Sequence, residues 1–268
     1  MTTLIFGDGH LGQAIAASLG ARSEPPPVVL GRPADGRHPA TGLVGTDLAF
    51  EASIPSAVGS NLAAALAAGC RRFVIATTGW DDARDAIDGA FRAHDAAAVA
   101  SPSFSLGVAA MLRLVEAAGS LFARLDDFDP YVLEWHRRGK LDRPSGTARE
   151  LARRLLEADP RRTGLATGRD GPPAPGELEV ASLRAGASPG MHVVGFDAPG
   201  ESFELRLTAR DRAAYAAGAI AAADWLRAGP RTPGIHGFDE VVDELFAPAA
   251  AEVAAPGPKL RAVAGSSG

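Results

Sequence analysis

A short stretch in the second half of the chain concentrates side chains that could move protons and hold an anion. His136 and Lys140 lie four residues apart, and a predicted amphipathic helix begins shortly after them. Histidine titrates near neutral pH and a lysine ammonium group donates protons, so these two are the candidate catalytic residues. A helix amino terminus also favours anions. The pattern predicts a site for a small molecule with one or two carboxylates, bound by Arg137, Ser145, Gly146 and Thr147.

The same residues also suit simpler roles. Ser145 or Thr147 could cap the predicted helix over 147–158 without touching a substrate. The positive charges could belong to a solvated basic loop. Both alternatives stay open on the residues alone.

A glycine-rich turn near the amino terminus predicts a second site, for a dinucleotide. The turn Gly7-Asp8-Gly9-His10-Leu11-Gly12 follows a short apolar strand and opens a predicted helix over 13–19. In this context the first glycine allows a tight turn, the second lets a pyrophosphate approach, and the third lets helix and strand pack closely. All six residues are candidate cofactor contacts, although the side chain of His10 is expected to be a plain turn residue. A strand–turn–helix unit that binds no nucleotide is the alternative.

The residues after the second predicted strand bear on the choice of cofactor. A site that prefers NADH places a carboxylate there, whereas this sequence has Gly31-Arg32, with Arg37 nearby. An arginine can pair with a 2′-phosphate, so Arg32 favours NADPH, with NADH possible. A solvated surface arginine is the alternative.

The elements that must position these residues fall into two groups. In the first hundred residues predicted strands alternate with helices, which is typical of an α/β fold: a Rossmann-like parallel-sheet nucleotide domain. After Asp129-Pro130 the strands follow one another around one helix, which predicts a smaller α+β domain with a mixed or antiparallel sheet. The predicted strands are 3–6, 27–30, 42–48, 72–76 and 96–100, then 131–136, 176–184, 191–197 and 202–210; the further predicted helices are 57–68, 81–94, 212–226 and 238–246.

These elements predict three parts of the chain. Residues 1–107 together with 211–246 form the dinucleotide-binding domain, because the small-residue helix after 211 can pack back on the first sheet. Residues 108–210 form a domain for substrate binding and oligomerisation. Residues 247–268 consist mostly of Ala, Pro, Gly and Ser, which predicts a disordered tail.

Composition narrows the function classes. The 268 residues are 46% hydrophobic, and 27 basic against 32 acidic residues give a net charge of −5, which argues against a nucleic-acid partner. No apolar run approaches the length of a membrane span, and the amino terminus lacks the features of a signal peptide, so we expect a cytoplasmic protein. The single cysteine, Cys70, excludes an intramolecular disulfide and is expected to be buried; no metal site is predicted.

The stretch around His136 resembles the signature of the dihydrodipicolinate reductase family. That signature is Glu-x-His-His-x-x-Lys-x-Asp-x-Pro-Ser-Gly-Thr-Ala, and the chain has Glu134-x-His136-Arg137-x-x-Lys140-x-Asp142-x-Pro144-Ser145-Gly146-Thr147-Ala148. Similar segments follow the family order over about residues 3–246, including Ser182-x-Arg184-x-Gly186 and Gly190-x-His192-x-Val194. We expect His192 to pack in the sheet or to line the pocket. The resemblance implies further cofactor contacts at Ala76, Thr77, Thr78, Gly79, Ser101, Ser103, Phe104 and Arg212.

The resemblance also implies a reaction. It is the NAD(P)H-dependent reduction of 4-hydroxy-tetrahydrodipicolinate, a cyclic imine dicarboxylate, to tetrahydrodipicolinate in lysine and diaminopimelate biosynthesis. The implied assembly is a homotetramer. Arg137, Ser103 and Leu207 depart from the family pattern of His, Asn and His, and the segment from 20 to 47 is short. The alternative is a divergent relative that reduces another cyclic imine or keto acid, for example in secondary metabolism. A non-catalytic nucleotide-binding sensor would have no use for His136 and Lys140.

Overall fold

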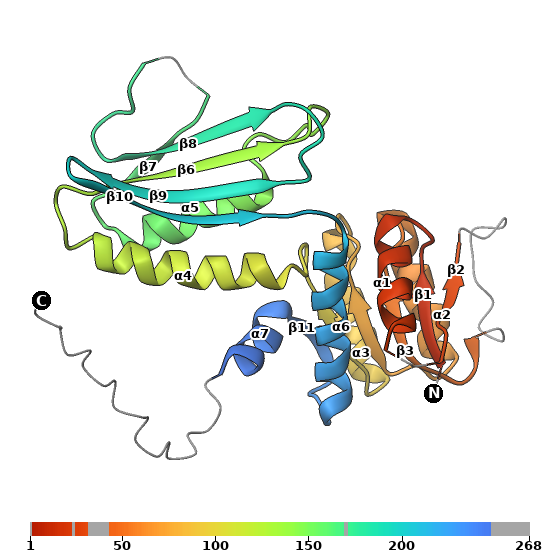
Figure 1. The fold of residues 1–268 in the computed structure, drawn as a ribbon. Coiled ribbons are helices and arrows are strands. Elements are labelled where there is room, and N and C mark those ends of the chain that lie inside the picture. Colours follow the sequence, from red (N-terminus) through yellow and green to blue (C-terminus); the bar gives the residue numbers. More distant parts are fainter. Residues whose placement is uncertain (1, 23–24, 32–42, 169–170, 248–268) are drawn as a thin grey trace, which may run out of the picture.

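The chain folds around two β-sheets, each with its own helices (Figure 1). The computed structural model describes residues 2–22, 25–31, 43–168 and 171–247. Its elements are β1 (Thr2–Phe6), α1 (His10–Gly20), β2 (Val28–Leu30), β3 (Thr46–Glu51), η2 (Pro55–Ala57), α2 (Val58–Ala67), β4 (Arg72–Ile75), η3 (Asp81–Ala83), α3 (Arg84–Ala93), β5 (Ala97–Ala100), α4 (Leu106–Phe122), β6 (Asp129–His136), α5 (Gly146–Ala158), β7 (Gly164–Ala166), β8 (Glu177–Arg184), β9 (Met191–Ala198), β10 (Glu201–Thr208), α6 (Ala213–Ala228), β11 (Gly234–Gly237) and α7 (Phe238–Phe246).

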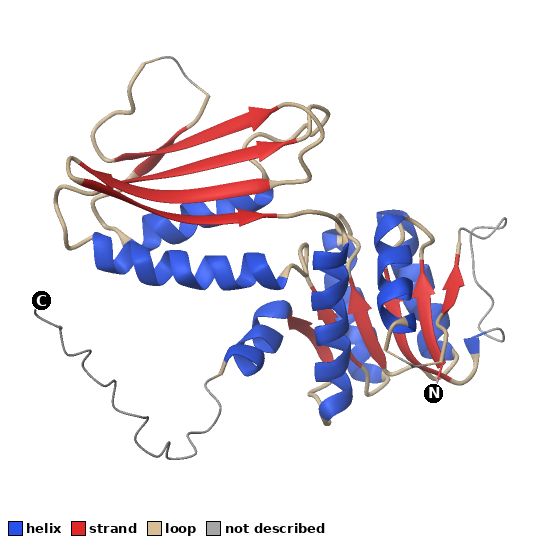
Figure 2. Cartoon of the chain, in the orientation of Figure 1, coloured by secondary structure: helices blue, strands red, loops and turns tan. Residues whose placement is uncertain are grey.

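The first sheet has six parallel strands in the order β11-β5-β4-β3-β1-β2. Its strands are apolar on both faces because helices cover both (Figure 2). Helices α1, α6 and α7 pack on one face around Ile5 and Phe50, whereas α2 and α3 pack on the other around Phe6 and Phe73. Cys70 lies in the second of these cores, buried as expected. The predicted α/β fold is confirmed.

The second sheet has five strands in the order β10-β9-β6-β8-β7 and is mixed. Strand β6 pairs in parallel with β8 and antiparallel with β9. Helices α4 and α5 cover one face, where Val132, Glu134 and His136 alternate with residues of the opposite face along β6. Figure 2 shows the other face without a helix over it. This alternation places the signature residues Glu134 and His136 on the helix-covered side.

Several expected elements differ in the structure. The third strand is β3, at Thr46–Glu51 rather than 42–48, because Gly45 has φ +84° in a turn before it. The pair β9–β10 has its predicted turn at Pro199-Gly200, but β10 ends at Thr208 instead of 210. The sequence analysis missed α4, β7 and β11. The predicted tail lies outside the described residues from 248 onward. Among the residues that the structure describes, no helix is long and apolar enough to cross a membrane.

Candidate functional site

The glycine turn has the geometry that a dinucleotide site requires. Gly7 has φ +106°, and a Cβ at this residue would lie 2.3 Å from the carbonyl oxygen of Ala52. A Cβ at Gly12 would lie 2.0 Å from the carbonyl oxygen of Gly7, so helix α1 can approach the strand only with glycine here. At Gly9, by contrast, no described atom lies within 4 Å of the Cβ position. The first and third glycines therefore serve packing, and the second leaves an approach open to the backbone.

Helix α1 begins immediately after this turn. Its N-cap residue is Gly9, which has no side chain to satisfy the amide groups of the first turn. Those amide groups and the positive end of the helix dipole form an anion site at the mouth of the turn. The residues present fit a pyrophosphate at this position.

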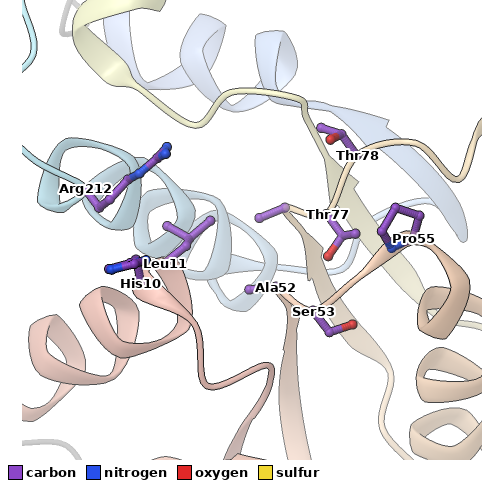
Figure 3. A pocket seen from close by; sticks show the side chains of 9 residues that line it. His10, Leu11, Ala52, Ser53, Pro55, Thr77, Thr78 and Arg212 are labelled. Atoms are coloured by element: carbon purple, nitrogen blue, oxygen red, sulfur yellow. The ribbon is translucent and has the colours of Figure 1, made fainter. Parts of the chain in front are cut away.

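A pocket of about 310 Å³ lies beside the turn, at the carboxyl ends of β1, β3 and β4 (Figure 3). In Figure 3, Arg212 and Thr78 stand on opposite sides of it. The lining includes six predicted cofactor residues, namely His10, Leu11, Ala76, Thr77, Thr78 and Arg212, together with Ala52, Ser53 and Pro55, which the sequence analysis missed. The missed residues directly follow β3, and their place at the carboxyl edge of a parallel strand is the signal that could have identified them.

Glu51 holds the floor of this pocket in place. Its buried carboxylate accepts hydrogen bonds from Ser53, Asn61 and Thr77, and its carbonyl oxygen accepts from the amides of Ala76 and Thr77. Burial raises the pKa of Glu51, and the hydrogen bonds from Ser53, Asn61 and Thr77 oppose that shift. Because one side chain ties the loop after β3 to the loop after β4, Glu51 is a positioning residue of the pocket.

Other predicted cofactor residues lie around the pocket without lining it. Ser101 donates a hydrogen bond to the carbonyl of Ser103 and accepts one from its amide, which shapes the turn between β5 and α4. Phe104 is buried, and its carbonyl oxygen lies 1.7 Å from the Cβ position of Gly218 in α6. Gly79 has φ +79° and its Cβ position is 3.4 Å from the ring of Pro55. These residues shape the elements next to the pocket.

Asp8 of the glycine turn lies beside the end of β2. Oδ2 of Asp8 lies 2.9 Å from the position of a Cβ on Gly31, the residue that follows β2. Arg32 lies outside the described residues. A carboxylate is therefore close to the end of the second strand, although it comes from the glycine turn and not from that strand.

A buried carboxylate, Glu134, organises the second predicted site. Its Oε1 accepts hydrogen bonds from the Ser145 amide at 2.9 Å, from Ser182 Oγ at 2.7 Å and from Arg184 Nη2 at 2.7 Å. Burial alone would raise the pKa of Glu134, but these donors outweigh it and lower the pKa to about 2. Glu134 is therefore ionised at neutral pH and fixes the start of α5 against the sheet.

Two imidazole rings face the other oxygen of Glu134. Nε2 of His136 lies 3.1 Å from Oε2, and Nε2 of His192 lies 3.8 Å from it. The two Nε2 atoms are 3.4 Å apart, and Ser145 Oγ is 3.3 Å from that of His192. Burial lowers the pKa of both histidines, that of His192 to about 4. Burial therefore favours the neutral form of both rings. The sequence analysis predicted no metal site and did not anticipate that Glu134, His136 and His192 would meet.

The remaining predicted substrate residues surround this cluster unequally. Ser145 caps α5, since its Oγ accepts from the amide of Ala148. A Cβ at Gly146 would meet no described atom within 4 Å. Lys140 forms an ion pair with Asp142 at 2.8 Å. Arg137 is exposed and bonds through its amide to the carbonyl of Ser188, outside the buried cluster.

Sheet register brings together residues to which the sequence analysis gave no catalytic or binding role. Glu134 stands opposite Ser182 on β8 and opposite His192 on β9, and His136 stands opposite Arg184. These residues are far apart in the chain and meet only through strand pairing. Their presence in three separate segments that resemble one family was the available signal.

Comparison with known proteins agrees with this architecture. The family model described as dihydrodipicolinate reductase, C-terminus, matches residues 107–242. A 4-hydroxy-tetrahydrodipicolinate reductase from Caulobacter vibrioides is 36% identical over 251 residues, covering 88% of this chain and 94% of the relative. One from Wolinella succinogenes is 35% identical over 211 residues, covering 75% and 78%. A dipicolinate-bound dihydrodipicolinate reductase from Paenisporosarcina sp. TG-14 shares the fold with a TM-score of 0.68 and 19% identity, covering 88% of this chain and 97% of that one. The chain belongs to the dihydrodipicolinate reductase family.

Proposed function

We propose that this protein reduces 4-hydroxy-tetrahydrodipicolinate to tetrahydrodipicolinate with a nicotinamide cofactor, the reduction step of lysine and diaminopimelate biosynthesis. The observation that carries the proposal is the buried cluster of Glu134, His136 and Ser145 at the amino terminus of α5, in a chain of this family. The glycine turn and its pocket supply a place for the cofactor. A non-catalytic sensor would need only the glycine turn and its pocket, not the buried cluster.

The start of α5 suits a substrate carboxylate. The Ser145 hydroxyl, the open backbone at Gly146 and the half-buried Thr147 offer donors next to the positive end of the helix dipole. Lys140 adds a positive charge on the loop before the helix. Arg137, exposed at the rim, is placed to attract the second carboxylate of a dicarboxylate rather than to grip it.

The chemistry divides between the two sites. A bound nicotinamide supplies a hydride. His136 and Lys140 bind or protonate the charge that develops on the substrate as the imine is reduced. Oε2 of Glu134 lies 3.1 Å from Nε2 of His136 and Oε1 accepts the Ser145 amide, so the catalytic ring and the carboxylate-binding helix end meet at one side chain. The junctions at residues 101–107 and 208–213, which connect the two sheets, provide hinges for a closure that excludes water.

The cofactor preference follows from charges near the ribose. Arg32 would pair with the 2′-phosphate of NADPH, which remains our preferred cofactor, with NADH possible. Asp8 next to Gly31 acts in the opposite direction, because its carboxylate repels a phosphate and accepts a hydrogen bond from a ribose hydroxyl. The ratio of kcat/KM for the two cofactors measures the balance.

The proposed assembly is a cytoplasmic homotetramer formed through the second sheet. Its face opposite α4 and α5 presents Trp135 and Leu183, 36% and 48% exposed, on adjacent strands. Residues 108–210 would then serve both substrate binding and oligomerisation, and 1–107 with 211–246 would bind the cofactor. Light scattering of the purified chain tests the tetramer.

A second substrate class is favoured by one contact. Leu207, at a family histidine position, packs on the start of α4, with Cδ1 at 3.0 Å from the Cβ position of Gly107. A polar group is thereby replaced by an apolar one beside the hinge, which suits a divergent relative acting on another cyclic imine or keto acid. A spectrophotometric assay of NADPH oxidation with freshly made 4-hydroxy-tetrahydrodipicolinate, against monocarboxylate cyclic imines and keto acids, tests the proposal. A higher kcat/KM for a monocarboxylate cyclic imine or a keto acid than for 4-hydroxy-tetrahydrodipicolinate would contradict the proposed reaction.

A further inference from the structure

Three metal-binding groups from two neighbouring strands converge in the buried cluster. Oε2 of Glu134 lies 3.1 Å from Nε2 of His136 and 3.8 Å from Nε2 of His192, and the two nitrogens are 3.4 Å apart. A point equidistant from three atoms at these separations and raised out of their plane to a tetrahedral position lies about 2.1 Å from each, which is the bond length of Zn²⁺ to imidazole nitrogen and carboxylate oxygen. The side chains already stand at the spacing of a tetrahedral site with one open position.

The two oxygens of Glu134 are used unequally. Oε1 accepts three hydrogen bonds, from Ser145, Ser182 and Arg184. Oε2 is buried and accepts no hydrogen bond from any residue in the described ranges. A buried acceptor without a donor costs free energy. One oxygen held by outer donors and the other left open is the arrangement of a metal-binding carboxylate with its supporting shell.

The ring of His136 is oriented for the same purpose. Its Nδ1 edge faces Gly190, whose Cβ position lies 3.2 Å from Nδ1, and the ring hydrogen-bonds to the backbone of Pro189. A proton on Nδ1 leaves the lone pair of Nε2 directed at Glu134 Oε2 and at His192. Acceptors that face one another in this way repel unless a proton or a metal ion lies between them.

We propose that Glu134, His136 and His192 form a binding site for a transition-metal ion, Zn²⁺ in the first instance. Ser145 Oγ lies 3.3 Å from His192 Nε2, at the edge of this group. Imidazole ligands favour Zn²⁺ and its neighbours in the first transition row, whereas Mg²⁺ and Ca²⁺ require oxygen ligands. The positive charges of Arg184 and Lys140 near the cluster are balanced by their partners Glu134 and Asp142. A hard cation held only by electrostatic attraction would therefore bind weakly there.

Occupation of this site has a consequence for the proposed reaction. The ion would use the Nε2 lone pair of His136 and block the approach to the start of α5. Zn²⁺ would therefore inhibit reduction in competition with the dicarboxylate substrate, and a chelator would restore activity. This consequence rests on the proposed function, whereas the binding itself does not.

Isothermal titration calorimetry on the full chain, stripped with EDTA and free of cofactor and substrate, measures the binding directly. We expect one equivalent of Zn²⁺ to bind per chain, and no heat from Mg²⁺. His192→Ala should weaken the affinity by at least about tenfold. His236→Ala is the matched control, because His236 is not part of this cluster and pairs with Glu240 at 2.8 Å. This variant should bind Zn²⁺ as the unsubstituted chain does. Co²⁺ in place of Zn²⁺ should give the visible absorption of a tetrahedral site.

Thermal unfolding of the unsubstituted chain keeps the test independent of any variant's folding. Zn²⁺ should raise Tm and Mg²⁺ should not, because a ligand that binds only the folded state stabilises it. The proposal is overturned by Zn²⁺ that leaves Tm unchanged and gives no heat, or by equal affinities of the unsubstituted chain and a folded His192→Ala variant. Zn²⁺ binding without turnover of the proposed substrate would support this site while rejecting the reaction.

Discussion

Arg184 and Glu134 form a buried ion pair between two parallel strands. Nη2 of Arg184 donates to Oε1 of Glu134 at 2.7 Å, and the two side chains are 7% and 0% exposed. Arg184 stands directly opposite His136 in the register of β8 and β6, and Glu134 precedes His136 by two residues, so the pair lies beside the ring proposed to be catalytic. The site therefore depends on a charge pair that the solvent does not reach.

Arg184→Met tests the weight of this pair. Removing the guanidinium leaves the Glu134 carboxylate buried without its counter-charge, which should lower the free energy of unfolding by about 3 kcal/mol. Urea denaturation at pH 7 measures the loss. Arg153→Met is the matched control, because Arg153 pairs with Glu150 and Glu157 on the surface of α5 and should cost less than about 1 kcal/mol. Equal losses in the two variants would contradict the account.

Glu51→Gln tests the buried carboxylate under the cofactor pocket. Burial raises the pKa of Glu51, so the stability that this group contributes is fully present below its unfolded pKa, near 4.5, and is lost as pH rises above it. The variant lacks this loss, and its stability relative to the unsubstituted chain should increase from pH 4 to pH 7 in denaturant titrations. Glu150→Gln should show the opposite trend, because hydrogen bonds from Arg153 lower the pKa of Glu150. A difference that does not vary with pH would disagree with this assignment.

The glycine turn predicts different outcomes for two substitutions to alanine. Gly12→Ala would place a Cβ 2.0 Å from the Gly7 carbonyl and should destabilise the fold by about 3 kcal/mol. Gly9→Ala meets no described atom, so stability should change by less than about 0.5 kcal/mol. Its methyl group would nevertheless obstruct a pyrophosphate, and the Kd for the nicotinamide cofactor, followed by fluorescence, should rise about tenfold. Unchanged cofactor affinity in Gly9→Ala would place the phosphates elsewhere.

Asp8→Asn tests the proposed charge balance at the ribose. Replacing the carboxylate beside Gly31 with an amide removes its repulsion of a 2′-phosphate, so the ratio of kcat/KM for NADPH over NADH should rise about tenfold. Asp81→Asn, in η3 and not among the residues that line the pocket, is the control and should leave the ratio unchanged. An unchanged ratio for Asp8→Asn would mean that the cofactor's ribose lies away from Asp8.

Local patterns account for what the sequence analysis predicted. The glycine turn needs only a strand, three glycines and a helix in succession, and the start of α5 needs only Ser145 before an amphipathic run. Both depend on contacts within a few residues, which a single sequence contains. Helix α4 also carried a local signal, the N-cap Ser105 and buried residues at Met111, Val115 and Ala118, that the analysis did not use.

Pairing between strands that are far apart in the chain explains which contacts the sequence analysis missed. The contacts of Glu134 with Ser182, Arg184 and His192 arise from the register of three strands, two of them parallel, which no spacing in the sequence encodes. The loop after β3 joins the cofactor pocket only because β3 lies between β1 and β4 in the sheet. Residues 32–42, which include Arg32, lie outside the described ranges. The prediction of cofactor preference therefore rests on the sequence and on the position of Asp8.

The most direct test of the proposed reaction compares turnover with cofactor binding in two variants. Purified protein is mixed with NADPH and 4-hydroxy-tetrahydrodipicolinate made by its synthase, and the nicotinamide absorbance is followed for the unsubstituted chain, His136→Ala and Lys140→Ala. The account predicts turnover by the unsubstituted chain and a loss of at least about a hundredfold in kcat for each variant, with the Kd for NADPH unchanged. Full activity in either variant, or no turnover by the unsubstituted chain despite tight NADPH binding, would contradict it.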